Sequence, residues 1–164
     1  MKGQKQLMSS NSAEWYTPPK IVSLVVQTLG EIDLDPCSNE GEPNVPARQH
    51  YTKADDGLFL PWSGRVYMNP PYGRQIEQWT GRLVNFYRLD QVTEAIALVP
   101  ARTDTQWFQP LYDFPICFVE GRLIFLGAED GAPFPSALAY MGPHPERFIR
   151  VFSAVGTVVR RACG

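Results

Sequence analysis

The sequence predicts an α/β fold with a mixed, mostly parallel sheet and flanking helices. Short apolar runs typical of strands alternate with segments in which apolar residues recur at helical spacing. Residues 94–100 form an apolar run typical of a strand buried on both faces of a parallel sheet. With 164 residues, 44% of them apolar, the chain can bury one core. We expect a single domain over residues 14–164 after a flexible arm over residues 1–13, which lack periodicity.

The first helix is predicted from its boundary residues. Thr17, followed by two prolines, is typical of an N-cap with proline in the first turn, and Gly30 is typical of a helix end. Four apolar residues between them recur at helical spacing: Ile21, Leu24, Val25 and Leu29. We interpret Trp15, just upstream, as a core or staple residue.

Residues 31–35 alternate polar and apolar side chains, which suits a strand that ends at Pro36. Ligands in open α/β sheets sit at the carboxyl ends of strands. Asp35 is therefore placed where its carboxylate could meet the ammonium group of an amino-acid-like cofactor; the alternative is an acid in a surface turn. Residues 39–49, with one glycine and two prolines, are expected to form a loop.

Two acidic residues, Asp55 and Asp56, follow that loop and precede Gly57. Their carboxylates could hydrogen-bond a nucleoside cofactor. The alternative is that they cap a short helix, which is the commoner role of an Asp-Gly pair in a loop.

The residues Asn69-Pro70-Pro71-Tyr72 follow the short apolar run of residues 65–68. Proline cannot donate to a sheet ladder, so the strand must end at Asn69 and the carbonyls around Pro70 point outward. The Asn69 amide oxygen and the Pro70 carbonyl can each accept one hydrogen of an NH2 group, while the Tyr72 ring can stack on a heterocycle. The alternative is a tight turn, because Asn-Pro and Pro-Pro pairs are common in turns.

These contacts fit the exocyclic amine of a purine or pyrimidine. Such an amine is a poor nucleophile because its lone pair is delocalised into the ring. Two hydrogen-bond acceptors favour the pyramidal amine, whose lone pair is free to attack, so the pattern predicts amine methylation. With a sulfonium methyl donor, in-line positioning and the negative end of a dipole matter more than a strong general base.

The second half of the chain continues the alternation of helices and strands. One helical face is predicted from Ile76, Trp79, Leu83 and Phe86, and we interpret Trp79 as a core residue. After the strand at residues 94–100, a helix is expected to open at residues 101–107. Further short elements are expected as strands at residues 116–119, 123–126, 137–140 and 157–159, and as a helix after Pro145.

Charge and cysteine content exclude several classes of protein. A net charge of −2 makes no overall case for nucleic acid binding, so any DNA contact must come from a local basic face. The cysteines are odd in number and widely spaced, which favours reduced thiols over a zinc site or a disulfide framework: Cys37, Cys117 and Cys163. No apolar run has membrane length and the polar N-terminus is not a signal peptide, so we expect a soluble, cytoplasmic protein.

Several ordered motifs resemble the small phage-type DNA adenine methyltransferases, the Dam-type DNA N6-adenine methyltransferase family. The similarity covers nearly the whole chain after the arm. It rests on residues 14–18, 34–38, 51–52, 55–58, 62–64, 69–73, 98–105 with Trp107, 120–123 and 132–137.

The resemblance implies a reduced Rossmann-like methyltransferase fold with S-adenosyl-L-methionine as cofactor and no metal. It implies that adenine flips out of double-stranded DNA onto the Asn69-Pro70-Pro71-Tyr72 corner, at a cost of roughly a few kcal/mol. The cofactor positions that it implies are Trp15, Thr17, Asp35, Pro36, Cys37 and Ser38, with Asp55 or Asp56 near the adenosine.

The chain departs from larger methyltransferases in two ways. It lacks a glycine-rich cofactor loop, and the 30 residues from 39 to 68 are too few for two strand-helix units, so we expect a reduced sheet. It also lacks a separate target-recognition domain. We therefore expect DNA contacts from arginines in loops, namely Arg74, Arg102 and Arg122, or from the second subunit of a homodimer. The alternative role for Arg102 is an ion pair with Asp104 or another acid.

Other functions stay open at this point. Within enzymes, the alternatives are methylation of cytosine N4, of guanine N2 in RNA, or of a protein glutamine. From another class, the alternative is a non-catalytic protein that binds DNA or the cofactor with the same fold. The resemblance favours a phage or prophage enzyme acting in a bacterial host, in restriction-modification or regulation.

Overall fold

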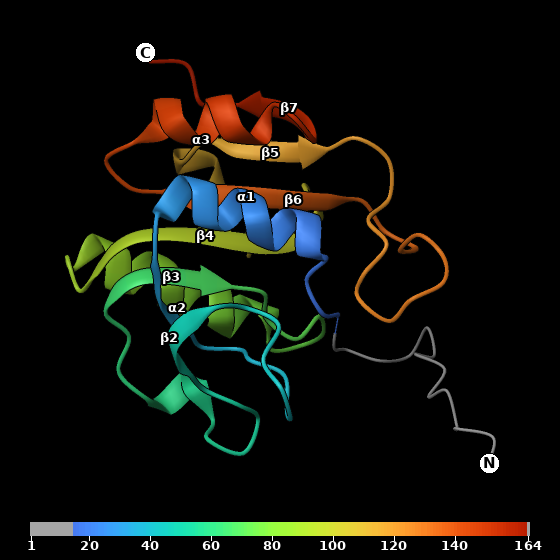
Figure 1. The fold of residues 1–164 in the computed structure, drawn as a ribbon. Helices are drawn as coiled ribbons and strands as arrows, with labels where there is room; N and C mark the ends of the chain where they lie inside the picture. Colours follow the sequence, from blue (N-terminus) through green and yellow to red (C-terminus); the bar gives the residue numbers. More distant parts are fainter. Residues whose placement is uncertain (1–14, 164) are drawn as a thin grey trace.

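One sheet organises the computed structural model, which describes residues 15–163, and its strand order is β2-β1-β3-β4-β6-β5-β7 (Figure 1). The strands are β1 (Ile32–Asp35), β2 (Ala47–His50), β3 (Gly64–Met68), β4 (Val92–Pro100), β5 (Ile116–Val119), β6 (Ser136–Met141) and β7 (Gly156–Val159). Strands β2, β1, β3 and β4 pair in parallel, whereas β6 is antiparallel to β4 and β5, and β7 is antiparallel to β5. The predicted mixed, mostly parallel α/β sheet is confirmed.

Helices cover both faces of this sheet. Helices α1 (Pro19–Leu29) and α3 (Pro145–Phe152) lie on the face toward the viewer in Figure 1, and α2 (Ile76–Arg88) lies behind the sheet. Two short 3-10 helices complete the fold, η1 (Gly57–Phe59) and η2 (Gln109–Asp113).

Side chains alternate between the two faces of the sheet along each strand, so they pack into two cores, one on each face of the sheet. On β3, Tyr67 packs into the core of α1 and α3, while Val66 and Met68 pack into the core of α2. On β4, Ile96 and Leu98 belong to the core of α1 and α3, and the residues that alternate with them belong to the core of α2: Ala95, Ala97 and Val99. Strand β4 is buried from residue 94 to residue 100, as its apolar run predicts.

The first helix begins one residue later than predicted. Its N-cap is Pro18, without a side-chain cap bond, so the prediction of Thr17 as N-cap is wrong. The physical reason is that the Thr17 hydroxyl is hydrogen-bonded to the Tyr67 hydroxyl on β3 instead. The end of the helix is as predicted: Gly30 takes a positive φ of 78°, which glycine adopts at little cost.

Three other segments differ from the expectation. The end of the expected 39–49 loop forms β2, an edge strand that pairs with β1 although its middle residues, Arg48 and Gln49, are exposed and polar. Residues 123–126 form a loop rather than a strand, because Phe125 is buried against Trp15 while its neighbour Leu126 bonds to the Tyr16 carbonyl. Residues 101–107 form turns that lead into η2 rather than an α-helix.

The connections β1–β2 and β2–β3 hold no α-helix among the described residues, only loops and η1. The short segment of residues 39–68 predicted a reduced sheet. The structure shows that this segment lacks α-helices but still contributes the strands β2 and β3. These two loops run past the carboxyl ends of β1 and β3, where a ligand would bind.

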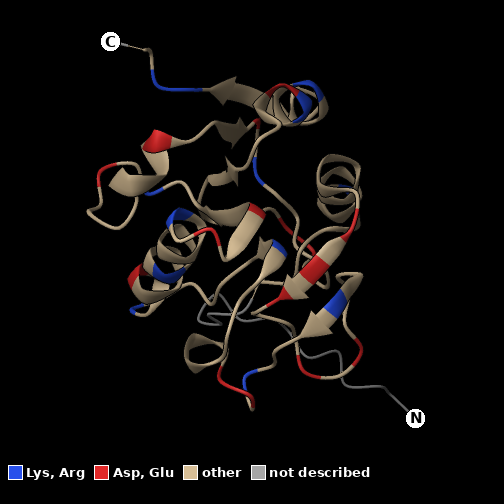
Figure 2. Ribbon diagram, turned by 90° about the vertical axis from the view of Figure 1, so that its left-hand side faces the viewer, with Lys and Arg blue, Asp and Glu red and all other residues tan. Residues whose placement is uncertain are grey.

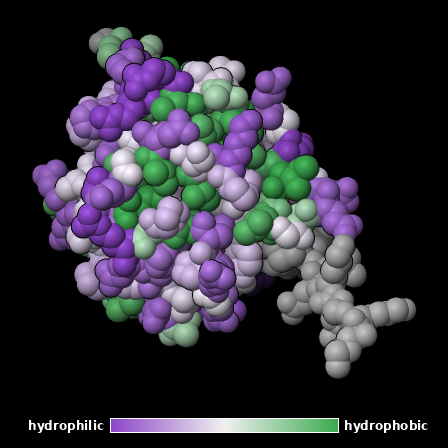
Figure 3. All heavy atoms as spheres, in the orientation of Figure 1, coloured by the Kyte–Doolittle hydropathy of each residue, from purple (hydrophilic) through white to green (hydrophobic). Residues whose placement is uncertain are grey.

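Charged and hydrophobic residues are distributed differently over the described chain. Positive and negative residues are interspersed along the chain (Figure 2), although β1 carries two acids, Asp33 and Asp35, and no basic residue. On the face that carries α1 and α3, hydrophobic side chains form patches separated by hydrophilic ones (Figure 3). Within residues 15–163, no helix has the length and apolar character needed to cross a bilayer. The predicted arm over residues 1–13 lies outside the described residues.

Candidate active site

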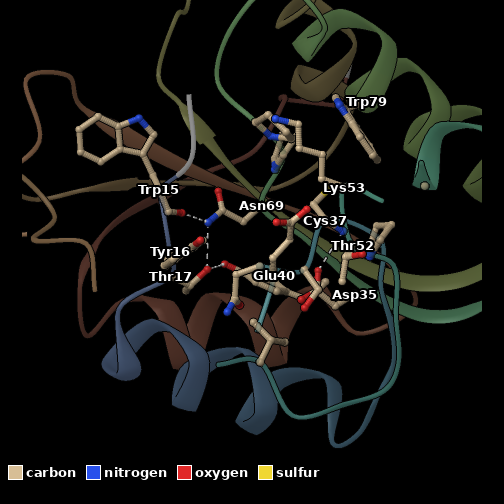
Figure 4. A pocket seen from close by; sticks show the side chains of 18 of the residues that line it. Trp15, Tyr16, Thr17, Asp35, Cys37, Glu40, Thr52, Lys53, Asn69 and Trp79 are labelled. Atoms are coloured by element: carbon tan, nitrogen blue, oxygen red, sulfur yellow. Dashed lines mark hydrogen bonds between the residues drawn. The ribbon is translucent and has the colours of Figure 1, made fainter. Parts of the chain in front are cut away.

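A cavity of about 480 Å³ lies at the carboxyl ends of β1 and β3. The chain passes from β1 to β2 on one side and then to β3 on the other, so the cavity sits where the strand order reverses. This is where open α/β sheets bind their ligands. The lining residues come from the segment before α1, the ends of β1 and β3, the two loops without an α-helix, and the segment from the end of β3 into α2 (Figure 4): Trp15, Tyr16, Thr17, Asp35, Pro36, Cys37, Ser38, Asn39, Glu40, Asn44, Val45, Thr52, Lys53, Asp56, Gly57, Tyr67, Asn69, Pro70, Pro71, Gln75 and Trp79.

The amide of Asn69 is fixed by two neighbours that follow each other closely in sequence. Its Nδ2 donates to the Trp15 carbonyl oxygen and to Thr17 Oγ1, the latter at 3.1 Å. Thr17 Oγ1 is itself 2.7 Å from the Tyr67 hydroxyl oxygen. A backbone carbonyl can only accept, so the amide nitrogen must face Trp15 and the amide oxygen must face away.

The Asn69 oxygen is left without a partner. Asn69 Oδ1 is buried and accepts no hydrogen bond from any described residue. Figure 4 shows the oxygen pointing away from the two groups that hold the nitrogen. Buried acceptors are normally satisfied, so this oxygen is available to a donor from outside the described residues.

Asp35 lies at the end of β1, buried to 3% exposure, and lines the cavity. Burial raises the pKa of this carboxyl to about 6, although the Cys37 amide donates to Asp35 Oδ1 at 3.1 Å and His50 and Ser38 favour the charged form. The Ser38 hydroxyl is buried, and its contact with Asp35 falls short of a well-formed hydrogen bond. Within residues 15–163, Asp35 forms no ion pair, and a buried carboxylate of this kind is suited to a positively charged ligand group.

The structure separates the two acids that the sequence left as alternatives. The carboxylate of Asp55 accepts from the Thr52 amide at 2.8 Å and from its hydroxyl at 3.1 Å, so Asp55 closes a turn and does not line the cavity. Asp56 lines the cavity, is exposed, and has a φ of 56°, in the left-handed region. Such a backbone is uncommon outside glycine. Asp56 is therefore the acid that is placed to meet a ligand.

Residues 4–139 match the family model of DNA N-6-adenine-methyltransferase (Dam). The chain belongs to this family. The resemblance inferred from the ordered motifs is thereby confirmed. No curated protein sequence gives a significant match.

In this Dam-family chain, Tyr72 stands beside the cavity rather than in its wall. Its hydroxyl donates to the Leu98 carbonyl at 3.3 Å, and its half-buried ring meets Phe134 and Phe125 edge to face, with ring centroids 5.4 and 6.3 Å apart. Trp15 packs against the same two phenylalanines. These four rings form an aromatic cluster next to Asn69, so the interpretation of Trp15 as a packing residue is confirmed, while Trp15 also lines the cavity.

The three arginines predicted to contact DNA are exposed and lie outside the cavity wall. Arg74 comes directly after the Asn69-Pro70-Pro71-Tyr72 corner, whereas Arg102 and Arg122 lie in the loops that follow β4 and β5. Within residues 15–163, none of the three forms an ion pair, and Arg102 is not paired with Asp104.

Sequence reasoning missed several residues of the Dam-family cavity. The sequence indicates Tyr67 only as part of an apolar strand, but its hydroxyl reaches Thr17. Asn44 falls in an expected loop and has no predicted role, yet its side chain donates to the Thr17 carbonyl at 2.9 Å. Trp79 is buried as predicted and also lines the cavity. For Tyr67, the sequence offers one indication of a role in the cavity, namely a tyrosine flanked by apolar residues at the end of a strand.

Proposed function

We propose that this Dam-family protein transfers a methyl group from S-adenosyl-L-methionine to the N6 amine of adenine in double-stranded DNA. The observation that carries the proposal is the buried, unpartnered Asn69 Oδ1 beside Pro70, at the carboxyl end of β3. An acceptor held in this way is suited to the hydrogen of an incoming amine.

The cavity residues fit the proposed cofactor. When bound, S-adenosyl-L-methionine supplies a methyl group on a positively charged sulfur. Asp35 would bind its ammonium group, because a buried carboxylate that forms no ion pair among the described residues gains most from a charged partner. Asp56 would accept hydrogen bonds from the ribose hydroxyls. Pro36, Cys37 and Ser38 would complete that side of the wall, and the cavity volume lies within the usual range for ligands of this size.

The protein would promote methylation by holding the N6 amine in a fixed position. Asn69 Oδ1 and the Pro70 carbonyl would accept the two N6 hydrogens, and Pro71 would keep that corner of the backbone rigid. Trp15 and Thr17 would hold the Asn69 amide so that no rotation is needed when the amine arrives. Such preorganisation of acceptors lowers the barrier without a strong base.

The N6 amine of the flipped base would reach Asn69 and Pro70 in the cavity wall, while the DNA would be held outside the cavity. Tyr72 would contribute stacking from the edge of the aromatic cluster, and Arg74, Arg102 and Arg122 would contact phosphates. A homodimer is the alternative source of further DNA contacts. We also propose, from the phage-type resemblance, that the protein is phage or prophage encoded and acts in the cytoplasm of a bacterial host.

The reaction can be tested by incubating the protein with methyl-labelled cofactor and unmethylated bacterial DNA, followed by nucleoside analysis. We expect label in N6-methyladenosine. Label in N4-methylcytosine, in RNA or in protein would contradict the proposed target, and binding of DNA or cofactor without any transfer would contradict the proposed enzyme.

The site can be tested with Asn69→Ala, compared with Asn85→Ala on the exposed surface of α2. We expect Asn69→Ala to lower turnover by about two orders of magnitude or more, as for other single preorganised groups, with little change in cofactor affinity. Asn85→Ala should match the wild type in both measurements. Unchanged methylation in Asn69→Ala would remove the assignment.

A further inference from the structure

The indole of Trp79 is a second unpartnered polar group in the cavity wall. The side chain is 6% exposed, lines the cavity, and its Nε1 is buried without a hydrogen-bond partner among the described residues. Figure 4 shows Trp79 on the opposite side of Asn69 from Trp15. An indole nitrogen can only donate, so the missing partner must be an acceptor.

A neighbouring tryptophan shows that the fold can satisfy such a group. Trp62 stacks on Trp79 with ring centroids 6.0 Å apart and an interplanar angle of 23°. The Trp62 Nε1 donates to the Gly57 carbonyl at 2.8 Å. Of two stacked indoles, the one outside the cavity is paired within the protein, and the one in the cavity wall is not. The difference indicates that the ligand supplies the acceptor for Trp79.

The wall beside Trp79 is closely packed at Gly57 and largely apolar. A Cβ atom on Gly57 would lie 2.4 Å from the Pro36 carbonyl oxygen and 3.3 Å from Trp79 Cη2, so only glycine lets these two walls approach so closely. Pro36 and Cys37 contribute further surface of low polarity. The carboxylates of Asp35 and Asp56 suit the charged and hydroxylated parts of the cofactor, which leaves this wall for the heterocycle.

We propose that Trp79 Nε1 donates a hydrogen bond to a ring nitrogen of the cofactor's adenine and so selects the adenine base. This inference rests on the proposed function, because it takes S-adenosyl-L-methionine as the ligand of the cavity. Trp79 is therefore a binding residue for the cofactor base, in addition to its place in the core of α2.

The test is calorimetric binding of S-adenosylhomocysteine, which has the same adenosine and no transferable methyl group. Wild type and Trp79→Phe are each titrated with this compound and with its 1-deaza, 3-deaza and 7-deaza analogues, in which one ring nitrogen is replaced by CH. We expect one of the three analogues to bind the wild type about three- to tenfold more weakly, the usual effect of one hydrogen bond. In Trp79→Phe, the natural compound should lose a similar factor, and that same analogue should lose nothing further.

Trp62→Phe is the matched control, because it removes an indole from the same stack whose N–H is already paired. It should lower thermal stability while keeping the wild-type preference for the ring nitrogen. If wild type binds S-adenosylhomocysteine and Trp79→Phe discriminates among the analogues as the wild type does, the inference about Trp79 is overturned and the proposed function stands. If folded wild type binds neither S-adenosylhomocysteine nor S-adenosyl-L-methionine, the proposed cofactor is wrong and the inference fails with it.

Discussion

Thr17 Oγ1 and the Tyr67 hydroxyl oxygen lie 2.7 Å apart across 50 residues of sequence, one before α1 and one on β3. Burial raises the pKa of Tyr67 far above its ordinary value, so this hydroxyl stays protonated and the contact is a neutral hydrogen bond. Through Thr17, the bond ties the segment before α1 to the Asn69 amide. The Asn69-Pro70-Pro71-Tyr72 corner is therefore positioned from the core of α1 and α3 as well as from β3.

Replacing Thr17 by Val should slow turnover more than it weakens cofactor binding. The substitution keeps the shape but removes the oxygen that accepts from Asn69 Nδ2. A buried hydrogen bond contributes about 1 kcal/mol, so we expect kcat to fall roughly fivefold. Single-turnover kinetics and calorimetry separate the two quantities.

Thr17→Ser, which retains the hydroxyl, should restore most of the lost turnover. Tyr67→Phe should act in the same direction as Thr17→Val, with a smaller effect, because it leaves the Thr17 hydroxyl in place but without its anchor. If Thr17→Val and Thr17→Ser lose stability equally and kcat equally, Thr17 is a packing residue and does not orient Asn69.

The raised pKa of Asp35 predicts a pH-dependent stability of the ligand-free protein. Burial raises this pKa from 3.8 to about 6, so between these pH values the folded state binds the proton more tightly than the unfolded state. The contribution of this group to stability is therefore complete below pH 3.8 and is lost as the pH rises to about 6. The loss amounts to about 3 kcal/mol, because one pKa unit corresponds to about 1.4 kcal/mol.

Urea unfolding of wild type and Asp35→Asn between pH 4 and 7 isolates this contribution. Asp35→Asn should gain stability relative to wild type as the pH rises through that window, and it should bind the cofactor more weakly at neutral pH. A stability difference between the two proteins that stays constant across the window would show that Asp35 does not titrate as its burial requires.

Much of the fold could be predicted because its elements are locally encoded. Strand β4 has an unbroken apolar run, α2 has an apolar face, and α1 ends at a glycine. Strand β2 could not be predicted in this way. Its middle residues are polar and exposed, and it is a strand only because its backbone pairs with β1 at the edge of the sheet. Pairing of this kind depends on tertiary contacts and leaves no periodic pattern.

The site was predictable in part for the same reason. Asp35 ends β1 and Asn69 follows β3, and the position of a strand end can be read from one segment. The hydrogen bond between Thr17 and Tyr67 and the unpaired indole of Trp79 depend on contacts between distant segments. For Thr17 the local pattern of a helix cap was misleading, because its hydroxyl is hydrogen-bonded to the Tyr67 hydroxyl on β3 and does not cap α1.

Gly57→Ala should lower stability and weaken cofactor binding, although the substitution adds only one methyl group. The added Cβ would lie 2.4 Å from the Pro36 carbonyl oxygen, so the loop between β2 and β3 must move. We expect a loss of stability of about 1–3 kcal/mol, as for other overpacked sites, and weaker cofactor binding in calorimetry.

Gly81→Ala is the matched control, because Gly81 is exposed in the middle of α2 and a Cβ atom added there would meet no neighbouring segment within 4 Å. Alanine at this position should raise stability by about 0.5–1 kcal/mol without changing cofactor binding. Equal effects of the two substitutions would argue that the wall at Gly57 is not closely packed.

Removing the arginines outside the cavity should weaken DNA binding in a salt-dependent way. Arg74, Arg102 and Arg122 are exposed and form no ion pair within residues 15–163, so their charges are available to phosphates. Arg160 is also exposed but is paired with Glu146 at 3.1 Å, which makes Arg160→Ala the matched control. Each phosphate contact contributes about 0.9 to the slope of log affinity against log salt concentration. Each of the three alanine variants should therefore lower that slope by about 1, measured by fluorescence anisotropy on a DNA duplex, whereas Arg160→Ala should leave it unchanged. A slope unaltered in all three variants would place the DNA on another face of the protein.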